Sequence, residues 1–180
     1  MVGTHSGNWD WSGAWGAAEW GGVTTVAERL EPVELFDAFV AARTARKLHI
    51  LPHRGGSRPP SVVLTELLNA GQVVALAADR DLSRRGVEVD FFGSQTKMPA
   101  GPAHLALETG CLLVAVGVWY EVDKVVLEFA PPIEVEGASE QQITQTMADA
   151  FEQIVRRHPE CWFMLQQLWL SHPSEWGGRG

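Results

Sequence analysis

The apolar run VVALAA occupies residues 73–78 and ends directly before Asp79. Such a run is typical of a parallel strand that is buried on both faces of a sheet. Short β-rich segments alternate with helical segments on both sides of it, which is the pattern of a layered α/β fold. We therefore expect a mixed, mostly parallel central sheet flanked by helices, with Asp79 at the carboxyl end of one buried strand.

The other elements follow from hydrophobic period and from turn residues. Strands are predicted at residues 23–28, 48–51, 86–92, 112–120 and 125–129, besides a stub at residues 1–4 that ends at His5. Helices are predicted at residues 8–20, 32–46, 59–69, 99–109, 139–157 and 160–170. A chain of 180 residues without an internal repeat is long enough for one α/β domain with its own core.

The stub before His5 is unusual, because a catalytic-looking turn rarely begins so close to a terminus with almost nothing to pair or cover it. We expect a single domain over residues 1–180 that lacks its N-terminal part, namely a first strand and upstream helices. A parallel strand is normally paired on both sides, so the isolated chain is expected to be poorly soluble and inactive.

Composition excludes several classes of protein. The net charge of -8 argues against a nucleic-acid partner, which requires a basic surface. Cys111 and Cys161 lie far apart in the sequence and suggest neither a disulfide framework nor a metal site. We find no apolar stretch of membrane-spanning length and no signal peptide in the sequence, and a reducing cytosol is the default compartment.

The strongest local motif is HSGNWD at residues 5–10, an H-x-x-x-x-D spacing in which a histidine ends a strand and Asp10 falls in the first turn of a helix. Gly7 allows a sharp turn that can bring the carboxylate towards the imidazole. A carboxylate that accepts the Nδ1 proton leaves Nε2 free to remove a proton from an alcohol. The alternative is that Asp10 only complements the helix N-terminus and that His5 is a capping residue.

This motif resembles that of the bacterial lysophospholipid acyltransferase-like group, which includes the lipid A lauroyl and myristoyl acyltransferases. Within that group the chain is most similar to the actinobacterial phosphatidylinositol mannoside acyltransferases. Further matching stretches are TVAERL at 25–30, ADRDL at 78–82, GVEVDFFG at 86–93, MPAGP at 98–102 and HPECWFMLQ at 158–166. The resemblance spans nearly the whole chain.

The resemblance implies transfer of a fatty acyl group from acyl-coenzyme A to a sugar hydroxyl of a membrane glycolipid, without a covalent acyl-enzyme. His5 would be the general base. Acyl-coenzyme A would be a donor substrate rather than a cofactor, and no metal is implied. The protein would lie peripherally on the cytoplasmic face of the cell membrane, where it would meet its acceptor.

Two carboxylates compete for the orientation of His5: Asp10 from the motif and Asp79 from the strand edge. Similar proteins carry glutamate at the second position, so the shorter aspartate is expected to need a bridging water. The sequence leaves both alternatives open.

Positive charge is needed where the coenzyme phosphates bind and where the thioester oxygen becomes negative. Arg43 lies in a predicted helix, while Arg85 belongs to an arginine cluster with Arg80 and Arg84 after Asp79. By resemblance, contact with acyl-coenzyme A is assigned to Arg43, Arg85 and Glu108.

Two other interpretations differ in class. One is a catalytically incompetent, truncated remnant that at most binds lipid. The other is an unrelated hydrolase with histidine and aspartate, but the sequence contains neither a G-x-S-x-G motif nor a metal-ligand cluster.

Overall fold

The computed structural model describes residues 1–81, 83 and 85–170 of the chain. Its strands are β1 (Val2–Gly3), β2 (Val23–Ala27), β3 (Leu48–Pro52), β4 (Leu76–Ala77), β5 (Val87–Phe91), β6 (Ser94–Met98), β7 (Leu113–Glu121) and β8 (Lys124–Ile133). Its helices are α1 (Trp9–Trp20), α2 (Val33–Thr44), α3 (Pro60–Asn69), α4 (Gly101–Thr109) and α5 (Glu140–Arg157), followed by a 3-10 turn at Pro159–Cys161. None of the described helices combines the length and the apolar character needed to cross a bilayer.

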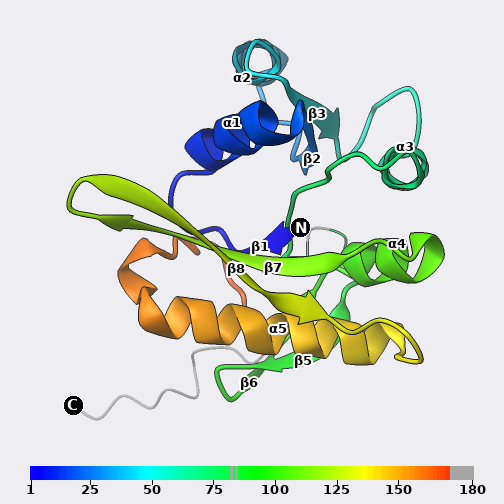
Figure 1. The fold of residues 1–180 in the computed structure, drawn as a ribbon, viewed down its shortest axis with the longest axis vertical. Coiled ribbons are helices and arrows are strands. Elements are labelled where there is room, and N and C mark those ends of the chain that lie inside the picture. The colour runs from blue at the N-terminus through cyan, green and yellow to red at the C-terminus, as the bar shows by residue number, and fades with distance from the viewer. Residues whose placement is uncertain (82, 84, 171–180) are drawn as a thin grey trace.

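The central sheet has the strand order β4-β1-β7-β8, in which β1 runs parallel to both neighbours and β8 is antiparallel to β7 (Figure 1). The parallel pair β2-β3 continues this sheet beyond β4. The backbone amide of Thr24 donates to the Val73 carbonyl at 3.0 Å, and the Ala75 amide donates to the Thr24 carbonyl at 2.9 Å. The expected mixed, mostly parallel sheet flanked by helices is therefore confirmed.

The strand that ends at His5 is paired on both of its edges. Val2 lies opposite Leu76 of β4 on one side and opposite Ala115 of β7 on the other. The expectation that this strand lacks a partner is wrong, because β4 and β7 arrive from later in the chain and enclose it. Long-range pairing supplies what the local sequence around the stub does not show.

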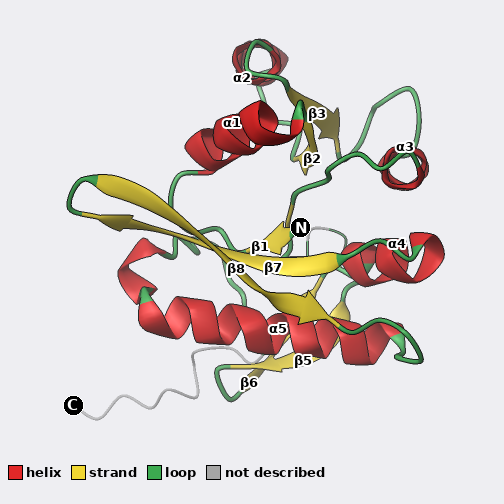
Figure 2. Cartoon of the chain, viewed as in Figure 1, coloured by secondary structure: helices red, strands yellow, loops and turns green. Residues whose placement is uncertain are grey.

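The helices α1 and α5 lie on opposite sides of the β7-β8 ribbon (Figure 2). The alternation of β7 explains this arrangement, since successive side chains point to opposite faces of a strand. Val116 and Val118 line a pocket together with residues of α1. A Cβ added at Gly117 would lie 2.8 Å from Ile154 of α5, so this glycine allows the helix to approach the sheet closely.

Helix α5 is specified by its first residue and by its apolar stripe. Ser139 and Gln142 form a capping box that satisfies backbone amides at the helix start. Ile143, Met147 and Phe151 recur at every fourth position and are at most 1% exposed. These side chains form the main core with residues of β5, β7 and α4.

Three segments differ from the prediction. The strand expected over the apolar run at 73–78 is shorter, since β4 spans only Leu76–Ala77, and both of its residues are half-buried. Strand β6 was not expected, because residues 94–98 are mostly polar. It pairs with β5 across the two-residue turn Phe92-Gly93, whose φ angles of 52° and 75° match a tight hairpin turn. The helix expected at 160–170 is also absent: beyond Cys161 the chain runs without helix up to Leu170 and forms isolated bridges with Ser6 and Thr96. Tertiary hydrogen bonds replace the helical ones there.

Candidate active site

His5 and Asp79 meet because they follow adjacent parallel strands in the same register. Gly3 is paired with Ala77 across β1 and β4, and two further residues along each strand lead to His5 and Asp79. Carboxyl ends of parallel strands form one edge of the sheet, which is where α/β proteins commonly place their sites. The pairing of β1 with β4 thus brings together His5 and Asp79, which are 74 positions apart in the sequence.

Asp79 is completely buried, and each of its oxygens has a donor. Its Oδ1 lies 2.5 Å from Nδ1 of His5. Its Oδ2 accepts from the backbone amide of His5 at 2.8 Å and from Nε1 of Trp162 at 2.9 Å. The contact between His5 and Asp79 is direct, so the expectation that the shorter aspartate needs a bridging water is wrong.

The imidazole of His5 is oriented by this contact, while its other side remains open. The side chain is 39% exposed, and Nε2 forms no hydrogen bond with any residue that the structure describes. A carboxylate beside Nδ1 favours the tautomer in which Nδ1 carries the proton. Nε2 then presents a lone pair to solvent or to a substrate hydroxyl.

Asp10 has a different partner. Asn8 caps helix α1 by accepting from the Trp11 amide, and this places Asp10 in the first turn of the helix. Its carboxylate accepts from Nε of Arg43 at 2.6 Å and from Nη2 of the same guanidinium at 3.4 Å. The Arg43 guanidinium also lies over the ring of Phe39, 5.4 Å from its centroid. Asp10 therefore ties α1 to α2, and Asp79 is the carboxylate that contacts His5.

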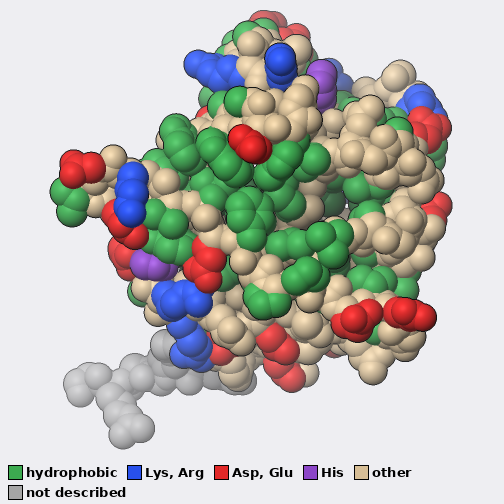
Figure 3. Space-filling model, viewed as in Figure 1, with side chains coloured by type: hydrophobic (Ala, Val, Ile, Leu, Met, Phe, Trp, Pro, Cys, Tyr) green, Lys and Arg blue, Asp and Glu red, His purple; other side chains and the backbone are tan. Residues whose placement is uncertain are grey.

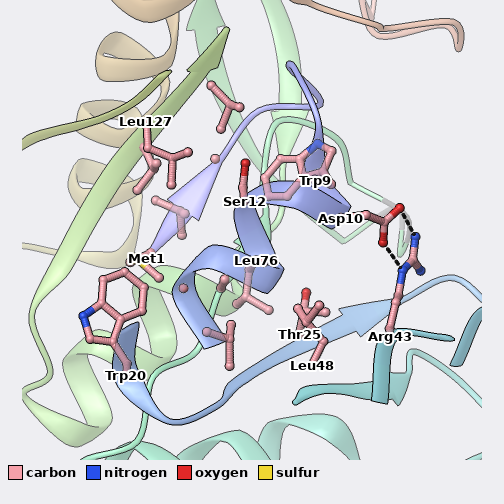
Figure 4. A pocket seen from close by; sticks show the side chains of 18 of the residues that line it. Met1, Trp9, Asp10, Ser12, Trp20, Thr25, Arg43, Leu48, Leu76 and Leu127 are labelled. Atoms are coloured by element: carbon pink, nitrogen blue, oxygen red, sulfur yellow. Dashed lines mark hydrogen bonds and ion pairs between the residues drawn. The ribbon is translucent and has the colours of Figure 1, made fainter. Parts of the chain in front are cut away.

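An apolar pocket of about 90 Å³ lies between α1 and the central sheet. Figure 4 shows the Asp10–Arg43 pair on one side of it and Met1 and Trp20 on the other. The remaining lining is almost entirely hydrocarbon, with Leu76 and Leu127 among its members. This pocket suits an apolar ligand.

A second, more polar pocket of about 440 Å³ lies at the carboxyl ends of β2, β3 and β4. Its charged and imidazole side chains belong to Glu28, His53, Arg54, Arg80, Asp81, Arg85 and His104. Arg80 donates to Glu28 at 3.0 Å. The Nε atom of Arg80 is buried and has no hydrogen-bond partner among the described residues, as expected of a donor near a ligand or a water.

The three residues assigned to acyl-coenzyme A by resemblance do not share one pocket. Arg43 lines the apolar pocket and Arg85 lines the polar one. Glu108 lies on the exposed side of α4, where it accepts from Thr65 at 3.0 Å, and it lines neither of these two pockets. Arg84, the remaining member of the arginine cluster, lies outside the described residues.

Sequence reasoning missed two residues at this edge of the sheet. Trp162 was expected in a final helix, yet its indole donates to Asp79. Glu28 was assigned no role, yet it pairs with Arg80 in the polar pocket. Both residues belong to stretches that carry the family resemblance, and this was the only sequence signal that pointed to them.

The sequence was compared with known protein families and proteins. The model of the bacterial lipid A biosynthesis acyltransferase family matches residues 1–171. Over 171 residues, or 95% of this chain, the sequence is 46% identical to the phosphatidylinositol mannoside acyltransferase of Mycobacterium tuberculosis (strain H37Rv). It is 44% identical to the protein of the same name from Mycolicibacterium smegmatis. The chain spans 54% and 56% of these two relatives, about half their length. The chain belongs to the bacterial lipid A biosynthesis acyltransferase family.

Proposed function

We propose that this chain carries the catalytic core of an O-acyltransferase that moves a fatty acyl group from acyl-coenzyme A to a sugar hydroxyl of a membrane glycolipid. The observation that carries this proposal is the contact of 2.5 Å between His5 and the buried Asp79, with Nε2 of His5 left open. The relatives named phosphatidylinositol mannoside acyltransferase support a phosphatidylinositol mannoside as acceptor.

In the proposed reaction, Nε2 of His5 removes the proton from the acceptor hydroxyl as its oxygen attacks the thioester carbonyl carbon. Asp79 stabilises the imidazolium that forms. The carbon–sulfur bond then breaks, and the coenzyme A sulfur leaves with the proton held by His5. The products are an ester and free coenzyme A, and no acyl-enzyme is formed.

The two pockets match the two chemical halves of the donor. The apolar pocket suits a hydrocarbon chain, since its lining offers few polar atoms. The polar pocket, with Arg54, Arg80 and Arg85, supplies the charge-assisted donors that phosphates require in a protein with a net charge of -8.

A membrane-bound acceptor requires a surface that meets the bilayer. Hydrophobic side chains gather over α1 and the β7-β8 ribbon on the face shown in Figure 3. Trp15, Trp20 and Phe129 form a mutual cluster with ring centroids 5.3 to 6.3 Å apart, and we call it the aromatic patch. Such rings favour the interface between lipid and water, which supports peripheral association with a membrane.

The proposal is tested with His5→Ala, assayed for transfer of a radiolabelled acyl group from acyl-coenzyme A to a phosphatidylinositol mannoside. We expect the rate to fall by about 10²–10⁴-fold, the contribution of a general base, while the circular dichroism spectrum stays unchanged. His49→Ala, an exposed histidine on β3, is the matched control.

Two outcomes would contradict this function. Turnover by His5→Ala at the wild-type rate would exclude His5 as the base. Wild-type protein that binds acyl-coenzyme A or lipid vesicles without any transfer would instead favour a catalytically incompetent, lipid-binding remnant.

A further inference from the structure

The segment after α5 runs antiparallel along the turn that carries His5. The Gly7 amide donates to the Cys161 carbonyl at 3.0 Å, and the Phe163 amide donates to the His5 carbonyl at 2.8 Å. Ser6 and Trp162 lie between these two bonds as a bridged pair. The backbone of the turn is therefore held from both ends by residues more than 150 positions later in the chain.

The same segment reaches Asp79 with a side chain. Nε1 of Trp162 donates to Oδ2 at 2.9 Å, while the other oxygen faces Nδ1 of His5. A completely buried carboxylate is costly unless its oxygens accept hydrogen bonds. The indole supplies one of these bonds and thereby holds the plane of the carboxylate.

The indole is itself fixed by packing. Its ring stacks on Phe92 with centroids 6.1 Å apart and meets the edge of Phe91 at 5.9 Å. A ring that is held from two sides directs its N–H with little freedom. The direction of the Trp162 donor is thus set by the β5-β6 hairpin, which carries both phenylalanines at one end.

We infer that Trp162 is a positioning residue of the active site: its indole N–H holds Oδ2 of Asp79 so that Oδ1 stays aligned with Nδ1 of His5. The segment Cys161–Phe163 fixes the backbone of the same turn. The catalytic pair is therefore completed by the segment that follows α5 and not by β1 and β4 alone. The effect on catalysis rests on the proposed function; the geometric effect on His5 does not.

The test compares Trp162→Phe, which keeps an aromatic ring and removes the N–H, with Trp169→Phe. Trp169 packs on Phe91 in the same cluster at 5.9 Å, but none of its hydrogen bonds reaches Asp79. We expect kcat of Trp162→Phe to fall by about tenfold or more, as for a lost hydrogen bond to a charged group. KM should change by less than about twofold, because the indole contacts Asp79 and reaches His5 only through it. Trp169→Phe should retain kcat.

A second readout does not need turnover. The Nδ1 proton of His5, identified by its loss in His5→Ala, should give a strongly deshielded proton resonance in the wild type. Trp162→Phe should move or broaden it, and Trp169→Phe should not. If Trp162→Phe unfolds, replacement of Trp162 by benzothienylalanine preserves the shape of the ring system and removes only the N–H.

Wild-type kcat and an unchanged resonance in the variant that lacks the N–H would overturn the positioning role. If the wild-type protein transfers no acyl group, the proposed function fails and the resonance alone decides the role of Trp162. A moved resonance would then still support it, and an unmoved resonance would refute it.

Discussion

At the scale of single residues, the choice between two carboxylates is decided by their partners. Asp79 is completely buried and contacts His5, whereas the Asp10 side chain is 60% exposed and pairs with Arg43. A buried carboxylate beside an imidazole acts on its tautomer and its charge. An exposed ion pair contributes little to stability, about 0.2–1 kcal/mol in similar cases.

These differences predict unequal effects of two matching substitutions. Asp79→Asn should lower kcat by about 10²–10⁴-fold, because an amide that donates to Nδ1 leaves the proton on Nε2, which then no longer accepts. Asp10→Asn should lower kcat by only a few-fold through loosened packing of α1. Steady-state kinetics and thermal unfolding of both variants measure the difference. A larger catalytic loss for Asp10→Asn would mean that the motif aspartate orients His5 during turnover.

At the scale of elements, the two arginines assigned to the donor are carried by different parts of the fold. Arg43 belongs to α2 and binds Asp10 of α1, so its guanidinium holds two helices together. Arg85 belongs to the loop between β4 and β5 and lines the polar pocket. The same substitution at these positions should therefore have different consequences.

Charge reversal distinguishes the two positions. Arg85→Glu should raise KM for acyl-coenzyme A by about tenfold or more through loss of a charge-assisted contact, and should leave KM for acyl-pantetheine, which lacks the nucleotide phosphates, within about twofold. Arg43→Glu places a second carboxylate beside Asp10 and should impair both donors equally, with a lower melting temperature. Initial rates with both donors measure these effects. Equal losses with Arg85→Glu would mean that Arg85 acts on the fold instead.

At the scale of the whole molecule, three of the exposed large apolar side chains, Trp15, Trp20 and Phe129, gather into one patch. An unpaired strand at His5 was the reason to expect poor solubility and inactivity, and it does not hold, because β4 and β7 pair with β1. The aromatic patch remains, with Trp15 and Trp20 37% and 40% exposed. Contiguous apolar surface of this kind marks a site of contact with lipid or protein.

We expect Trp15→Gln/Trp20→Gln to weaken binding to phosphatidylglycerol-containing vesicles by about tenfold or more, since burial of aromatic area drives interfacial binding. Leu112→Gln/Leu165→Gln, which changes two exposed leucines outside the patch, should bind like the wild type. Vesicle co-sedimentation measures membrane binding, and light scattering measures self-association. Unchanged vesicle binding with reduced self-association would identify the patch as a protein contact surface.

The sequence by itself determined the features that depend on local order. The apolar period of residues 139–157 and the cap at Ser139 specify α5. The run at 73–78 contains β4, which leads to Asp79, although β4 spans only Leu76–Ala77 and both residues are half-buried. Period and capping act within a few residues, so they are readable without the fold. The motif HSGNWD likewise pointed to His5 and to family membership.

Only the tertiary structure decided which groups meet. The register between β1 and β4 brings Asp79 to His5, and α2 takes Asp10 away through Arg43. Polar residues 94–98 become a strand only because β5 pairs with them, and Trp162 leaves its predicted helix because the turn at His5 offers backbone partners. These outcomes depend on hydrogen bonds between segments far apart in the chain, and no local pattern encodes which distant partner will satisfy a given backbone group.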